Sequence, residues 1–300
     1  MDADVLVIGE ALMDIVESGE GARELVGGSP ANVAVGLARQ NHRVRLLTRI
    51  GRDDRGRRIA GRVEDSGASL DERSWSTSPT STARARLRAD GSAEYDFAID
   101  WDVPVVEPET ARVVHTGSIA LFLEPGGAAV LESLRHAAAG GALVSLDPNI
   151  RPALVPDRAA ALARFEDAAA SADLVKLSDE DAEWLFPGAA SDDVLAQIAN
   201  LGPRLVVMTR GAEGAVGLGP GGVVAVRPLV VRVADTIGAG DAYMASLVSS
   251  VLDDPAVFDD ADRFAAALRR AAVMAGITVS RAGANPPTRA EVDAAAAGDE

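Results

Sequence analysis

Short apolar runs rich in Val, Leu and Ile recur along the chain and predict strands buried on both faces of a sheet. These runs are 5–8, 44–50, 143–146, 174–177 and 205–208. Segments between and after them have the spacing of apolar residues typical of amphipathic helices. These are 31–40, 54–66, 127–139, 158–170, 191–200, 241–252 and 259–279. The alternation predicts an α/β domain with a mostly parallel sheet and right-handed crossovers.

The alternation is interrupted at residues 76–102, where the chain is polar and rich in turn formers. Strand patterns at 83–87 and 93–97 flank an Asp-Gly turn at 90–91, which predicts a β-hairpin. Such a hairpin either decorates an edge or covers the carboxyl ends of the strands, where open α/β sheets bind ligands. Its aromatic residues are Tyr95, Phe97 and Trp101. Because pockets favour aromatic walls, these residues favour a lid.

The sequence Asp-Thr-Ile-Gly-Ala-Gly-Asp at 235–241 leads into a helical pattern, so we expect a helix to begin at Asp241. Gly238 and Gly240 allow a tight turn that leaves backbone N–H groups free at the helix N-terminus, where an anion such as phosphate is favoured. A carboxylate beside that anion could take the proton of an attacking hydroxyl. The alternative is that Asp241 only caps the helix. A helix N-terminus should also favour the charged carboxylate, which would make Asp241 a weak base that chiefly orients the hydroxyl.

A second glycine-rich segment, Gly-Gly-Ser-Pro-Ala-Asn at 27–32, precedes another helical pattern. Asp14 follows the first predicted strand and should lie at its carboxyl end. Asp14 and Asn32 together could hold vicinal hydroxyls of a sugar, since one accepts hydrogen bonds and the other both donates and accepts. Taken singly, each is better explained structurally, Asp14 by an Asx turn and Asn32 by a helix cap.

Composition excludes several classes of protein. The chain has 300 residues, 48% of them hydrophobic, which suffices for a full core. With no cysteine, disulfides and thiolate chemistry are excluded, and a cytoplasmic protein is expected. No signal peptide or membrane span is apparent. A net charge of −16 argues against nucleic-acid binding. Lys176 is the only lysine, and its surroundings match neither a Walker A loop nor a protein kinase.

Together these segments resemble the PfkB, or ribokinase-like, family of carbohydrate kinases over nearly the whole chain. The matching segments are 27–32, 50–56, 147–152, 176–183, 209–211 and 235–241. The resemblance implies a single domain over residues 1–300, with a three-layer, Rossmann-like α/β core and a small β-sheet lid formed by about 12–27 and 80–102. It also implies MgATP-dependent phosphorylation of a sugar hydroxyl, and a homodimer formed through the lid.

The resemblance further implies roles for individual residues. Asp241 is the expected catalytic base, and the expected anion hole for the transferring phosphoryl group is formed by Gly238, Ala239 and Gly240. The implied sugar contacts are Asp14, Gly28, Asn32, Phe97, Arg151 and Asp241. The implied ATP contacts are Lys176, Ser178, Thr209, Gly211 and Gly214. A monovalent cation, K⁺, is expected at Asp235, Ile237, Val279 and Gly283.

The segment that resembles the family's magnesium-organising motif departs from it. The family often has Asn-x-x-Glu, whereas this chain has Ser-Asp-Glu-Asp at 178–181. Asp181 is the first candidate to hold Mg²⁺ through water and Glu180 the second, although both could simply be acidic residues of a first helical turn. His115 lies at a strand end, and we expect it to be structural because this chemistry needs no imidazole.

The choice of sugar rests on two segments, 147–152 and 176–180, which look most like the fructokinase and 2-keto-3-deoxygluconate kinase branches. Arg151 could bind a substrate carboxylate or serve the nucleotide phosphates. The low aromatic content, 4%, disfavours a nucleoside kinase. We therefore rank fructokinase first, 2-keto-3-deoxygluconate kinase second and ribokinase third, with a non-catalytic sugar-binding relative as a different class.

Overall fold

The large sheet of the protein runs through its centre. The computed structural model describes residues 3–18, 21–87, 93–107 and 110–297. The strand order is β15-β14-β13-β12-β11-β10-β1-β4-β6, parallel from β6 to β13 and antiparallel at β14 and β15. The strands are β1 (Val5–Ile8), β4 (Val44–Leu47), β6 (Ser69–Leu70), β10 (Val113–Gly117), β11 (Leu143–Asp147), β12 (Leu174–Ser178), β13 (Leu205–Thr209), β14 (Ala215–Gly219) and β15 (Gly222–Val226). The predicted α/β class and mostly parallel sheet are confirmed.

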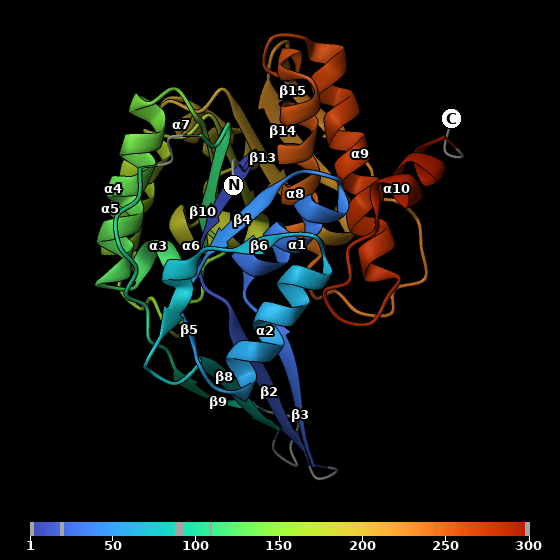
Figure 1. The fold of residues 1–300 in the computed structure, drawn as a ribbon. Coiled ribbons are helices and arrows are strands. Elements are labelled where there is room, and N and C mark those ends of the chain that lie inside the picture. Colours follow the sequence, from blue (N-terminus) through green and yellow to red (C-terminus); the bar gives the residue numbers. More distant parts are fainter. Residues whose placement is uncertain (1–2, 19–20, 88–92, 108–109, 298–300) are drawn as a thin grey trace.

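Helices cover both faces of this sheet (Figure 1). Alternate residues of β1 enter different cores, Val5 and Val7 on one face and Leu6 and Ile8 on the other. The first core is covered by α1 (Ser29–Arg39), α2 (Asp54–Asp65), α8 (Ala239–Asp253), α9 (Ala261–Val279) and α10 (Arg289–Ala296). The second is covered by α3 (Ile119–Phe122), α4 (Gly126–Ala139), α5 (Arg158–Ala169), α6 (Asp179–Leu185) and α7 (Ser191–Ala199). Burial of both faces explains why the strands are continuous apolar runs.

Short elements connect these layers. Strands β5 (Ile50–Gly51) and β7 (Trp75–Ser76) form a two-stranded parallel pair. The 3₁₀ helices are η1 (Glu72–Ser74), η2 (Gly211–Glu213) and η3 (Pro255–Phe258). In the part of the chain that is described, no helix is both long enough and apolar enough to cross a membrane.

A second, four-stranded sheet, here called the small sheet, has the order β3-β2-β8-β9 and projects from one end of the molecule (Figure 1). Its strands are β2 (Leu12–Ser18), β3 (Gly21–Gly27), β8 (Thr82–Leu87) and β9 (Ala93–Ala98). The predicted hairpin is present as β8 and β9, while its Asp-Gly turn at 90–91 lies outside the described residues. Since β2 follows directly after β1, the small sheet begins at the carboxyl end of the parallel strands.

Some sequence-based expectations about elements were wrong. The run 44–50 is divided between β4 and β5. The last long helix begins at Ala261, and η3 precedes it. Trp101 does not line a lid: it is 4% exposed, belongs to the second core, and its indole N–H donates to the Ala120 carbonyl at 2.9 Å. An aromatic residue next to a polar hairpin is compatible with either a pocket wall or the hydrophobic core. Trp101 packs in the core.

Candidate active site

Asp241 lies where the N-terminal turns of α1 and α8 meet. Its side chain is buried, and its Oδ1 accepts a hydrogen bond from the Ser29 hydroxyl at 2.6 Å. Its Oδ2 accepts one from the Asn32 amide at 2.8 Å. Helix α8 begins at Ala239, after Gly238, so Asp241 occupies the first turn and is not the residue at which the helix begins. The two glycine-rich segments found in the sequence therefore converge on one carboxylate.

The electrostatics of Asp241 differ from the expectation that its charged form is favoured. Burial raises the pKa of Asp241, while hydrogen bonds from Ser29 and Asn32 and the charges of Lys176 and Arg151 offset part of the rise. Removal from water outweighs the helix N-terminus because a carboxylate loses its hydration on burial. A raised pKa makes Asp241 a stronger base than an exposed aspartate, and its two partners fix its orientation.

The turn before α8 has the geometry of an anion site. Gly238 has φ +78°, a left-handed conformation that favours glycine, and a Cβ there would lie 2.7 Å from that of Ala284. The first N–H groups of α8 have no partner within the helix, although that of Ala239 donates to the Thr236 carbonyl at 3.3 Å. The Lys176 ammonium lies beside this turn: a Cβ built on Gly240 would be 3.1 Å from the lysine Nζ. The expected anion hole thus has the only lysine of the chain next to it.

Lys176 is buried and pairs with Asp147, at 3.0 Å between Nζ and Oδ2. The other oxygen of Asp147, Oδ1, is buried without a hydrogen-bond partner in the described part of the chain. Burial raises the pKa of Asp147, Lys176 opposes the rise, and the charges of Asp181 and Asp241 add to it. Sequence reasoning assigned no role to Asp147, although it ends strand β11 inside a matched motif.

Asp14, Gly28 and Arg151 lie around the same edge of the sheet. Asp14 packs so closely on the backbone that a Cβ on Gly27 would lie 1.9 Å from its Oδ2. Gly28 has φ +105°, and a Cβ there would meet the Glu10 carbonyl at 2.4 Å. Burial raises the pKa of Asp14, and the charge of Arg151 lowers it. The charge of Arg151 also lowers the pKa of Asp241, so one guanidinium acts electrostatically on both aspartates.

Glu10 is a second residue that sequence reasoning missed. It follows β1, is 5% exposed, and its Oε2 accepts the Ala120 backbone N–H at 3.3 Å. Burial raises the pKa of Glu10 to about 7, against hydrogen bonding from Ser118. Only its position just beyond the first strand could have pointed to it.

Phe97 belongs to the small sheet and shares a cross-strand row with Asp14. Asp14 pairs with Ala83, and Ala83 pairs with Phe97. Residues paired directly across a sheet project from the same face, so Asp14 and Phe97 lie on one face of the small sheet. The side chain of Tyr95 lies outside the described residues.

The expected nucleotide residues lie at the ends of β12 and β13. Ser178 caps α6, its hydroxyl accepting the Asp181 backbone N–H at 2.9 Å. Thr209 is half-buried and donates to the Leu177 carbonyl at 3.4 Å. Gly214 has φ +89°, and a Cβ there would lie 2.1 Å from the Val226 carbonyl, so only glycine fits. Gly211, exposed at the start of η2, has φ +50° and open space around it.

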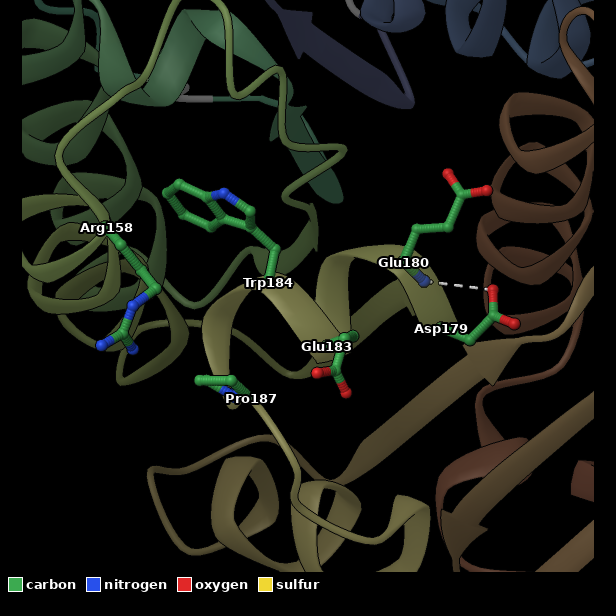
Figure 2. Close-up of a pocket in the computed structure, with 6 residues that line it drawn as sticks. All are labelled: Arg158, Asp179, Glu180, Glu183, Trp184 and Pro187. Atoms are coloured by element: carbon green, nitrogen blue, oxygen red, sulfur yellow. Dashed lines mark hydrogen bonds between the residues drawn. The ribbon is translucent and has the colours of Figure 1, made fainter.

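The two candidate magnesium residues have different surroundings. Asp181 is buried and accepts backbone N–H groups with both oxygens, from Ile150 at 2.7 Å and Ser178 at 3.0 Å. Glu180 is exposed and borders an open hollow of about 610 Å³ beside α6 (Figure 2). The hollow is lined by Arg158, Asp179, Glu180, Glu183, Trp184 and Pro187. Asp181 therefore ties the end of β12 to the loop after β11, and Glu180 is the carboxylate that faces open space.

The residues of the expected K⁺ site lie together. Asp235 accepts the backbone N–H of Ile237 at 3.0 Å and that of Gly283 at 2.8 Å. Its own N–H donates to the Val279 carbonyl at 3.1 Å. The two hydrogen bonds that it accepts lower the pKa of Asp235, so its carboxylate is ionised near neutral pH.

The surroundings of His115 fit the structural role expected for it. It is 1% exposed on β10, its Nδ1 lies 3.0 Å from the Ser145 hydroxyl, and burial lowers its pKa to about 3. The ring is therefore neutral near pH 7.

Comparison with known proteins places the chain among sugar kinases. The model of the pfkB family of carbohydrate kinases matches residues 2–291. Probable fructokinase-4 of Arabidopsis thaliana is 31% identical over 309 residues, covering 96% of this chain and 95% of that protein. The structure of a fructokinase with bound ATP from Xylella fastidiosa superposes with a TM-score of 0.85 at 25% identity, covering 99% of both chains. A double mutant of the fructokinase from Vibrio cholerae O395, in a form with bound fructose, ADP and potassium ion, gives a TM-score of 0.81 at 25% identity, covering 98% and 99%.

Proposed function

Since this chain belongs to the pfkB family of carbohydrate kinases, we propose that it is a fructokinase, which transfers the γ-phosphoryl group of ATP to a hydroxyl of fructose. The observation that carries the proposal is the buried Asp241 carboxylate, held by Ser29 and Asn32 beside the glycine turn of α8. Fructose ranks first because relatives that span almost the whole chain are fructokinases.

In the proposed reaction the sugar hydroxyl lies next to Asp241, which takes its proton as the oxygen attacks the γ-phosphorus. The N–H groups at Gly238, Ala239 and Gly240 stabilise the charge on the transferring group. Lys176 adds a positive charge beside that turn, while Asp147 keeps the lysine in place before ATP arrives. Phosphoryl transfer needs chiefly positioning and charge neutralisation, and these residues supply both.

We place the sugar between the core and the small sheet, which serves as the lid. Asp14 and Asn32 hold sugar hydroxyls, Gly28 lets the sugar approach the backbone, and Phe97 covers it. ATP binds along the ends of β12 and β13, against Ser178, Thr209, Gly211 and Gly214. We also propose a homodimer formed through the small sheet, whose strand β2 exposes Val16 to 38%.

The chain's residues fit Mg²⁺ that is bound chiefly by ATP phosphates and water. Among the described residues, no three His, Asp or Glu side chains are grouped closely enough to hold a metal. Asp181 is already occupied by two backbone N–H groups, so it would act through water, as would the exposed Glu180. The unpaired Oδ1 of Asp147 is a further acceptor for such a water. Mg²⁺ would neutralise phosphate charge.

The ionised Asp235 carboxylate fits a K⁺ ion, since hard cations prefer oxygen ligands and its two oxygens retain lone pairs beside the hydrogen bonds that they accept. The Val279 carbonyl accepts the N–H groups of Ala234 and Asp235, so it would reach the ion only in place of one of these hydrogen bonds. We propose that K⁺ binds there with the backbone of Ile237 and Gly283, and that its charge supports the neighbouring anion hole.

A second candidate substrate is 2-keto-3-deoxygluconate. The exposed Arg151 guanidinium acts on Asp14 and Asp241 and could form a bidentate contact with a substrate carboxylate.

The proposal is tested by ATP turnover with fructose, 2-keto-3-deoxygluconate and ribose, each across a range of concentrations. We expect the highest kcat/KM with fructose. A preference for the keto acid or for ribose would change the substrate assignment but leave the assignment as a sugar kinase intact. Sugar binding without turnover of ATP would identify a non-catalytic relative.

A further inference from the structure

The matched segment at 50–56 has no part in the proposed chemistry, yet it forms a dense contact with the chain leading into the small sheet. Asp53 caps α2, its Oδ1 accepting the Gly56 N–H at 2.8 Å. The same carboxylate accepts the Thr80 hydroxyl at 2.6 Å and, through Oδ2, the Thr80 N–H at 2.8 Å. The Thr80 Oγ1 in turn accepts the Gly51 N–H at 3.0 Å. Thr80, 4% exposed, is thus held by three hydrogen bonds from this segment.

The glycines of the segment are required by this contact. A Cβ on Gly51 would lie 2.6 Å from the Ser78 carbonyl oxygen and 2.7 Å from the Thr80 nitrogen. A Cβ on Gly56 would lie 1.9 Å from the Gly51 carbonyl oxygen and 3.0 Å from the Thr80 Oγ1. Since both close approaches involve backbone atoms that cannot move aside, glycine at 51 lets residues 78–80 approach the segment, and glycine at 56 lets α2 begin against the Gly51 carbonyl.

The contact is close to the residues that the small sheet presents to the sugar. Thr80 precedes β8 by two residues, and Ala83 is the centre of the row that joins Asp14 to Phe97. Three residues of extended chain span about 10 Å, so the hydrogen bonds of Thr80 hold the chain within about 10 Å of that row.

Neighbouring contacts hold the same side of the small sheet. The Ser81 hydroxyl accepts the Asp100 N–H at 3.0 Å, and the Arg49 guanidinium donates to the Asp100 carboxylate at 2.8 Å. On the other side the chain leaves β3 through Gly28, with φ +105°. At β3 itself, Glu24 forms ion pairs with Arg55 and Arg58 of α2. The small sheet is therefore attached to the core by buried hydrogen bonds at β8 and by partly exposed ion pairs at β3.

We propose that the Asp53–Thr80 contact is the buried support of the lid on the β8 side and that both residues are positioning residues for sugar binding. This inference rests on the proposed function, in which the small sheet covers the sugar. When the support is lost, a smaller fraction of the enzyme holds Asp14 and Phe97 in place. The apparent affinity for the sugar falls in proportion to the fraction of enzyme that remains competent to bind. Turnover at saturating sugar stays the same.

The test compares Thr80→Val with Thr80→Ser. Valine keeps the shape but removes the hydroxyl bonded to Asp53 and Gly51, whereas serine keeps it. Hydrogen bonds to charged groups are strong, so we expect the KM for fructose to rise roughly tenfold or more in Thr80→Val, with kcat and the KM for ATP near the wild-type values. Thr80→Ser should resemble the wild type. Without ligands, amide exchange in residues 82–86 should be faster in Thr80→Val, and that in α8 unchanged.

Two further variants keep the test decisive. Asp53→Asn retains a good cap for α2 but loses the negative charge that strengthens the hydrogen bonds from Thr80. It should therefore raise the KM for fructose, and it provides a test even if Thr80→Val does not fold. Asp157→Asn, at the cap of α5, is the control for altering a cap and should not change KM. An unchanged KM in Thr80→Val or Asp53→Asn, or a fall in kcat alone, would overturn the proposal. If the wild type phosphorylates none of the sugars, the proposed function fails, while unchanged exchange in 82–86 would independently reject the support.

Discussion

Replacing Glu10 with glutamine should change how the stability of the protein depends on pH. Glu10 is 5% exposed, and burial raises its pKa from the ordinary 4.5 to about 7. Between these two values the folded protein keeps a proton on Glu10 that the unfolded chain releases. This contribution to stability is fully present below pH 4.5 and is lost as the pH rises through about 7.

The size of the effect follows from the pKa. A tenfold change in proton affinity corresponds to about 1.4 kcal/mol. The rise from 4.5 to about 7 therefore corresponds to about 3 kcal/mol. Glutamine cannot ionise and keeps an oxygen that can accept the Ala120 N–H. Relative to the wild type, the free energy of unfolding of Glu10→Gln should increase by about 3 kcal/mol from the acidic to the alkaline end of this range.

The assay is denaturant unfolding of both proteins at several pH values from below 4.5 to above 7, followed by tryptophan fluorescence. Glu72→Gln, at an exposed glutamate of η1, is the matched control, and its difference from the wild type should stay flat. If the curves for Glu10→Gln and the wild type run parallel across the range, Glu10 does not carry the proton that the reasoning assigns to it.

Three further predictions concern the cation, the lid and the dimer. Replacing sodium or choline with K⁺ should raise activity, and Asp235→Ala should abolish the difference; a flat response in the wild type would remove the cation assignment. With nucleotide bound, fructose should slow amide exchange in residues 83–87 and 93–101, because lid closure excludes water, and unchanged exchange would reject a moving lid. Sedimentation should report a dimer, and a monomer at micromolar concentration would reject the dimer alone.

Local sequence patterns predicted the core well, because buried strands and tight turns each leave a signal in neighbouring residues. Continuous apolar runs identified strands such as β1 and β12, whose residues pack on both faces of the sheet. The positions of Gly238 and Gly28 also followed from sequence, since a turn that needs positive φ selects glycine. Strands β2 and β3 were missed by the residue pattern, because a sheet with one exposed side mixes polar and apolar residues, and only the family resemblance placed a lid there.

Contacts between distant segments were beyond the reach of local patterns. Nothing near Ser29 shows that its hydroxyl bonds a carboxylate 212 residues away. The pairing of Lys176 with Asp147 likewise depends on the adjacency of β11 and β12. The raised pKa of Asp241 depends on burial by the whole fold, so sequence reasoning counted only the helix N-terminus and predicted the opposite direction.

The central claim, that Asp241 is the base for sugar phosphorylation, is tested most directly by the turnover of Asp241→Asn with saturating fructose and ATP. Asparagine keeps the shape of the side chain but cannot accept the proton, so kcat should fall by roughly two to four orders of magnitude. The KM for fructose and the circular dichroism spectrum should stay near the wild-type values. Asp262→Asn, at an exposed aspartate in the first turn of α9, is the control and should retain full activity. A wild-type kcat in Asp241→Asn would contradict the mechanism.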